Sequence, residues 1–192
     1  MNLANKLTIS RIFLTFVFLF FLFVHGFWAK LISLIIFILA ALSDLFDGMI
    51  AHNRNMITDF GRLMDPIADK ILVLAAFAAF VQMQIIEAWM LLIIMSREIL
   101  ITSLRLFALN KGKVLSAARA GKHKTISQMA VIFVILGFIV LKEAMLTYFT
   151  WNPGWEKFFR NGIYVLMLIT VGLTLYSGLS YLWENRKIIA RL

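Results

Sequence analysis

Residues 43–70 read SDLFDGMIAHNRNMITDFGRLMDPIADK, and this stretch decides how the rest of the sequence is interpreted. It places four aspartates, Asp44, Asp47, Asp65 and Asp69, beside long apolar runs. The first two are three residues apart and the last two are four apart, so each pair would share one face of a helix. We expect the first pair at the end of one helix and the second pair at the start of the next, joined by a short turn around residues 53–55.

Four carboxylates at this position need cations. An aspartate inside a membrane helix costs about 2.5–3.5 kcal/mol, and two facing pairs would also repel each other. The chain has no cysteine, and ligation by oxygen alone favours Mg²⁺ or Mn²⁺ over zinc. The pattern therefore predicts divalent metal binding by the four aspartates, and two such ions could clamp a diphosphate. Two alternatives remain: solvated carboxylates paired with Arg54, Arg62 and Lys70, or a site in a cation channel or transporter.

The composition indicates an all-α integral membrane protein. Of 192 residues, 62% are hydrophobic and only 15% are charged, whereas soluble domains average about 45–50% and about 25%. Crossing a bilayer takes about 20 apolar residues per helix. The apolar runs predict six transmembrane helices in a single domain of residues 1–192. The runs are residues 12–29, 31–43, 71–86, 88–109, 125–141 and 162–183.

The distribution of basic residues predicts the orientation. If both termini are cytoplasmic, the outer segments contain only Lys30, Lys142, Lys157 and Arg160. Most of the others then lie inside: Lys6, Arg11, Arg54, Arg62, Lys70, Arg105, Lys111, Lys113, Arg119, Lys122, Lys124, Arg186, Lys187 and Arg191. Cytoplasmic loops of membrane proteins carry such an excess. This excess explains the net charge of +9, so nucleic-acid binding is not needed to account for it. The same orientation places the aspartates at the cytoplasmic surface.

The aspartate segment also resembles the signature D-x2-D-G-x2-A-R-x8-G-x3-D-x3-D of the CDP-alcohol phosphotransferase family. Every fixed position matches except His52, where the family has arginine. The resemblance implies that the four aspartates bind two divalent ions and that Asp69 is also the general base. It further implies a CDP-diacylglycerol site lined by Asn5, Thr8, Gly48, Ala51, His52, Thr58 and Gly61.

Three further stretches resemble the bacterial phosphatidylglycerophosphate synthases within this family. They are N-x-L-T-x-x-R at residues 5–11, R-E-I-L at residues 97–100 and G-K-x-K-T at residues 121–125. This resemblance implies a homodimer in the bacterial inner membrane that transfers a phosphatidyl group from CDP-diacylglycerol to sn-glycerol 3-phosphate. Inositol phosphate, phosphatidylglycerol and serine remain alternative acceptors, and a divalent cation transporter is the alternative from another class.

Three basic residues are candidates for binding the phosphate of the acceptor. Arg105, Lys122 and Lys124 would lie at the same cytoplasmic surface as the aspartates. A doubly charged phosphate needs several cations, which bind it through charge-assisted hydrogen bonds. Contact with anionic lipid headgroups would equally explain these residues. Arg97 and Glu98 lie deeper in their helix, and we expect an ion pair there with partners on other helices.

Overall fold

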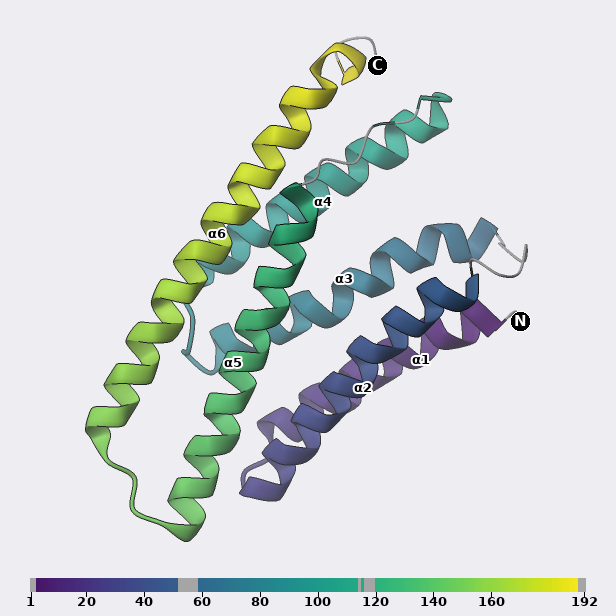
Figure 1. Ribbon diagram of the computed structural model, residues 1–192. Coiled ribbons are helices and arrows are strands. Elements are labelled where there is room, and N and C mark those ends of the chain that lie inside the picture. Colours follow the sequence, from purple (N-terminus) through teal and green to yellow (C-terminus); the bar gives the residue numbers. More distant parts are fainter. Residues whose placement is uncertain (1–2, 52–58, 114, 116–119, 190–192) are drawn as a thin grey trace. The chain divides into compact units, whose positions relative to one another are not determined.

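The computed structural model describes residues 3–51, 59–113, 115 and 120–189, and every regular element among them is a helix (Figure 1). The helices are α1 (Leu3–Phe23), α2 (Phe27–Ala51), α3 (Asp59–Gln82), α4 (Ala88–Asn110), α5 (Ala120–Tyr148) and α6 (Pro153–Ile189). The expectation of an all-α chain with six helices is confirmed for these residues. For residues 3–8, 44–51, 59–69, 120–122, 153 and 187 only the backbone is described.

The first two helices form a hairpin whose position differs from the sequence prediction. The apolar run of residues 12–29 predicts one helix, but α1 ends at Phe23 and α2 begins at Phe27. Gly26 lies between them with φ of +107°, a conformation that side-chain-bearing residues rarely adopt. The two helices pack side by side (Figure 1), and the rings of Phe18 and Phe37 meet between them at 5.3 Å.

The α1–α2 turn is held by two charged side chains. The buried ammonium of Lys30 donates to the carbonyl oxygens of Leu22 at 2.6 Å and Val24 at 2.8 Å. Leu22 lies in the last turn of α1 and Val24 directly follows the helix, so neither carbonyl accepts a hydrogen bond within the helix, and Lys30 satisfies both. The amide of Gly26 donates to Oε1 of Glu143 in α5 at 2.7 Å. The turn is therefore tied both to its own second helix and to α5.

The described chain divides into two compact units. One comprises residues 1–79 and 134–156, and the other comprises residues 80–133 and 157–192. Because the boundaries fall inside α3, α5 and α6, these three helices contribute to both units. The single membrane domain of residues 1–192 stays a prediction.

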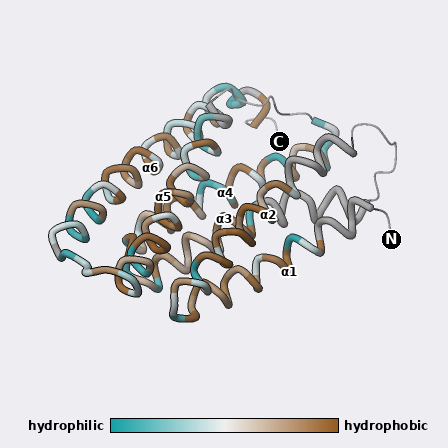
Figure 2. Tube along the Cα trace, turned by 60° about the horizontal axis from the view of Figure 1, so that its bottom comes forward, coloured by the Kyte–Doolittle hydropathy of each residue, from teal (hydrophilic) through white to brown (hydrophobic). Residues whose placement is uncertain are grey.

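Large apolar side chains are exposed on most of the helices. Phe13, Phe20, Phe158 and Trp183 are each about two thirds or more exposed, and hydrophobic stretches run along the described part of the helices in Figure 2. Apolar surface on this scale is typical of proteins that contact lipid or a partner. Among the described residues, His123–Tyr148 and Gly154–Arg186 are long and apolar enough to cross a membrane, and Ile9–Phe23, Phe27–Ser43 and Lys70–Gln82 are shorter apolar segments.

Candidate active site

The four aspartates of the signature belong to α2 and α3. Asp44 and Asp47 lie in the last two turns of α2, and Asp65 and Asp69 lie in α3. The backbone is helical through both segments, so the spacing of three and of four residues places each pair on one face of its helix. All four positions fall in the same compact unit. Their side chains lie outside what the structure describes, so metal binding by them stays a prediction.

The positions predicted to bind CDP-diacylglycerol come from three helices of this unit. Asn5 and Thr8 lie in the first turns of α1, Gly48 and Ala51 lie at the end of α2, and Gly61 lies near the start of α3. His52 and Thr58 fall between α2 and α3, outside the described residues. Two of these three helices, α2 and α3, also carry the aspartates.

The donor set suits a hard divalent cation. Carboxylates are the only metal-binding groups in the signature, apart from His52, and oxygen ligands are the ones that Mg²⁺ and Mn²⁺ prefer. Within the part of the chain whose side chains are described, no other group of three or more histidine, aspartate or glutamate side chains could hold a metal ion. The chemistry of the aspartate segment therefore fits a divalent ion, and metal binding there stays a prediction.

The residues predicted to bind the acceptor phosphate lie in the other unit. Arg105 is in α4, whereas Lys122 and Lys124 are in the first turns of α5. Arg105 is exposed, and its guanidinium lies 5.8 Å from the centre of the Tyr181 ring of α6, within reach of a cation–π interaction. The side chain of Lys122 lies outside the described part of the structure.

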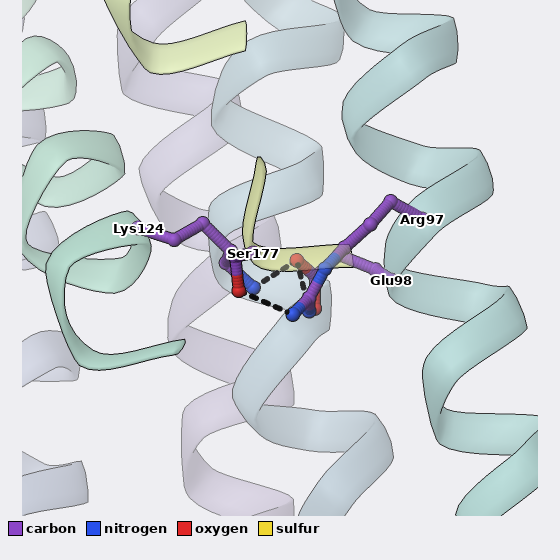
Figure 3. Close-up of polar contacts among 4 residues, drawn as sticks. All are labelled: Arg97, Glu98, Lys124 and Ser177. Carbon is purple, nitrogen blue, oxygen red and sulfur yellow. Dashed lines mark hydrogen bonds and ion pairs between the residues drawn. The ribbon is translucent and has the colours of Figure 1, made fainter. Parts of the chain in front are cut away.

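Lys124 is buried and ion-paired. Its ammonium donates to Oε1 of Glu98 in α4, and the guanidinium of Arg97 approaches the same oxygen at 3.4 Å. Arg97 also donates from Nη2 to the hydroxyl of Ser177 in α6 at 2.8 Å. Figure 3 shows how the four side chains, from three helices, converge. The expected ion pair of Arg97 and Glu98 is present, and its partners on other helices are Lys124 and Ser177.

The hydroxyl groups of α6 are a feature that the sequence analysis missed. Thr170, Thr174 and Ser177 are fully buried, and their spacing of four and three residues puts them on one face of the helix. Thr170 shares a hydrogen bond of 2.7 Å with Ser127 of α5. The signal was available, because hydroxyl residues at this spacing in an apolar helix commonly mark a helix–helix interface in membranes.

Comparison with known proteins decides the family. Residues 1–176 match the sequence model of the CDP-alcohol phosphatidyltransferases. The chain belongs to this family. Members of the CDP-alcohol phosphatidyltransferase family depend in general on divalent cations.

Several CDP-alcohol phosphatidyltransferases resemble the chain over most of its length. A protein of Bacillus subtilis named CDP-diacylglycerol–glycerol-3-phosphate 3-phosphatidyltransferase is 35% identical over 83% of this chain and 95% of its own length. A protein of Salmonella paratyphi A with the same name is 33% identical over 96% of this chain and 95% of its own length. A probable phosphatidylglycerophosphate synthase of Mycobacterium tuberculosis is 39% identical over 73% of this chain and 66% of its own length.

Proposed function

We propose that this chain transfers the phosphatidyl group of CDP-diacylglycerol to sn-glycerol 3-phosphate, forming phosphatidylglycerophosphate and releasing CMP. The observation that carries the proposal is the similarity to proteins named for this reaction, which covers up to 96% of the chain. The aspartate signature supports the phosphatidyl transfer, and the cations of α4 and α5 support an acceptor that carries a phosphate.

The proposed reaction is a direct displacement. The carboxylate of Asp69 takes the proton of the acceptor hydroxyl, whose oxygen then forms a bond to the β-phosphorus. The bond between that phosphorus and the bridging oxygen breaks, and CMP leaves with the oxygen. Two divalent ions at Asp44, Asp47, Asp65 and Asp69, taken to be Mg²⁺ or Mn²⁺, would neutralise the charge that develops on the diphosphate.

The remaining site residues bind and orient the two substrates. Asn5, Thr8, Gly48, Ala51, Thr58 and Gly61 would line the CDP-diacylglycerol site, with His52 in place of the family's arginine. Arg105, Lys122 and Lys124 would bind the phosphate of glycerol 3-phosphate. A guanidinium and an ammonium can both form charge-assisted hydrogen bonds to phosphate oxygens.

The proposed setting is the cytoplasmic face of a bacterial plasma membrane. Six crossings with both termini inside follow from the apolar runs and from the excess of basic residues in the inner segments. Exposed Phe13, Phe20 and Trp183 support contact with lipid. A homodimer is part of the same proposal and follows from the resemblance to the family.

One assay tests the reaction and the acceptor together. Purified protein is incubated with CDP-diacylglycerol and, separately, with glycerol 3-phosphate, inositol phosphate, phosphatidylglycerol or serine. We expect CMP release and a new phospholipid with glycerol 3-phosphate, and loss of both when a chelator removes divalent cations. If a product forms with another acceptor and none forms with glycerol 3-phosphate, that other compound is the acceptor. Absence of CMP release with every acceptor would refute the transferase reaction.

A further inference from the structure

In the unit of residues 80–133 and 157–192, two largely buried cationic side chains contact the same carboxylate oxygen. Lys124 of α5 and Arg97 of α4 both contact Oε1 of Glu98, and all three side chains are largely or fully shielded from solvent. These three groups together carry one net positive charge. A buried charge persists only when it is paired and hydrogen-bonded, and Glu98 supplies such a pairing for Lys124.

Arg97 is itself fixed from a third helix. Its Nη2 donates to the hydroxyl of Ser177, and a Cβ added at the neighbouring Gly178 would lie 3.1 Å from the Cγ of Arg97. The stem of Arg97 therefore packs closely against the backbone of α6, and a Cβ at position 178 would displace it by a few tenths of an ångström. Helix α6 thus holds Arg97, Arg97 contacts Glu98, and Glu98 holds Lys124.

The contact with Glu98 restrains Lys124, whose side chain is flexible. Lysine carries its charge on a flexible four-carbon stem, and ordering such a side chain at the moment of binding reduces affinity. The contact with Glu98 orders the ammonium of Lys124 before any ligand binds. Arg97 contacts the same oxygen of Glu98. When the ammonium of Lys124 donates a hydrogen bond to a phosphate, Glu98 therefore still has a cationic partner.

We propose that Glu98 is a positioning residue of the acceptor site: it holds the ammonium of Lys124, charged and ordered, for the phosphate of the acceptor, while Arg97 and Ser177 hold Glu98. The inference rests on the proposed function, in which Lys124 binds that phosphate. Glu98 itself touches neither substrate. Its removal therefore affects the binding of one substrate and leaves the chemical step and the other substrate nearly unchanged.

The test is the steady-state kinetics of Glu98→Gln. The amide keeps the size of the side chain but loses its charge, so that the ammonium of Lys124 is no longer held by a carboxylate. We expect the KM for glycerol 3-phosphate to rise about tenfold, the factor that corresponds to ordering one long side chain. The kcat and the KM for CDP-diacylglycerol stay near those of the unaltered protein. An unchanged or lower KM for glycerol 3-phosphate overturns the proposal, as does an equal rise in both KM values.

A second ion pair of the same kind supplies the matched control. Lys142 donates to Oε1 of Glu156 at 2.8 Å, in the other unit and with about a third of each side chain exposed. Glu156→Gln removes the same charge from a lysine–glutamate pair, so any general effect of losing an ion pair appears in it too. We expect all three kinetic constants of Glu156→Gln to stay near those of the unaltered protein. A rise in the KM for glycerol 3-phosphate equal to that of Glu98→Gln overturns the positioning role.

Two further variants separate the inference from the function on which it rests. Lys124→Ala raises the KM for glycerol 3-phosphate at least as much as Glu98→Gln. If Lys124→Ala leaves it unchanged, the assignment of Lys124 to the acceptor fails and the inference fails with it. If only Glu98→Gln leaves it unchanged, the inference fails alone. Should Glu98→Gln not fold, Ser177→Ala loosens Arg97 and gives a smaller rise of the same KM; no rise then overturns the proposal.

Discussion

Asp69 is the residue on which the proposed chemistry depends most. It is the last aspartate of the signature and lies in the second helical turn after Gly61 on α3. Its proposed role as the base differs from that of a metal ligand, because a base must accept a proton whereas a ligand needs only an oxygen. An amide at this position separates the two roles.

Asp69→Asn is expected to lower kcat by about 100- to 10,000-fold, the usual contribution of a positioned proton acceptor. The amide retains an oxygen for a cation but cannot take the proton. The measurements are CMP release and, in parallel, Mn²⁺ binding by electron paramagnetic resonance. Asp59→Ala is the matched control, since Asp59 begins the same helix but lies off the signature. An equal loss in both variants, or an active Asp69→Asn, would show that the proton acceptor is elsewhere.

At the scale of single residues, the sequence predicts which residues belong to a site better than it predicts which side chains contact each other. The aspartates could be found because their spacing is local and repeats the helical period. The ion pair of Glu98 and Lys124 could not, because 26 residues separate them and nothing in either segment shows that α4 and α5 meet there. Lys124 was predicted to contact phosphate from a cytoplasmic surface, whereas the structure shows it buried against a carboxylate.

At the scale of the elements, the α1–α2 turn departs most from what the sequence predicts. Residues 12–29 contain no charge that would mark a boundary, so apolar content alone predicts one continuous helix. The boundary is set instead by Gly26, whose positive φ ends the helical path, and by Lys30 and Glu143, which hold the turn. The contact with Glu143 spans 117 residues, which local patterning cannot reveal.

Glu143→Ala is expected to lower the thermal stability of the detergent-solubilised protein. The amide of Gly26 loses its acceptor and Lys30 loses a neighbouring carboxylate, and leaving a buried polar group unsatisfied costs about 1–3 kcal/mol. Glu143→Gln keeps an oxygen for Gly26 and should be affected less. Glu184→Ala, at an exposed glutamate of α6, serves as the control. A melting temperature of Glu143→Ala equal to that of the control would mean that the turn does not depend on α5.

At the scale of the whole molecule, the number and type of elements were predictable and the membrane crossings stay a prediction. Six helices followed from six apolar runs because charged or turn residues separate each run from the next. Whether each run crosses the bilayer depends on its length against the thickness of the hydrocarbon region. By that criterion α5 and α6 contain clear candidate spans in the described residues, whereas α1, α2 and α3 contain shorter apolar segments.

The proposed topology can be tested by labelling single cysteines. The natural chain has none, so each introduced thiol is the only target. Asn110→Cys, at the exposed end of α4, should react with a membrane-impermeant maleimide only after cells are opened. Thr150→Cys, exposed between α5 and α6, should react in intact cells. Labelling of Asn110→Cys in intact cells would contradict a cytoplasmic end of α4.

The ion pair within α4 has a consequence for how the protein is made. Under the proposed topology, α4 precedes α5 in the chain and reaches the bilayer ahead of it, and each unpaired charge at the centre of a membrane helix costs about 2.5–3.5 kcal/mol. Glu98 does not enter alone, because Arg97 is its neighbour in the chain and contacts the same oxygen that Lys124 later occupies. The helix thus carries its own counter-charge through insertion, and α5 completes the pairing once it arrives.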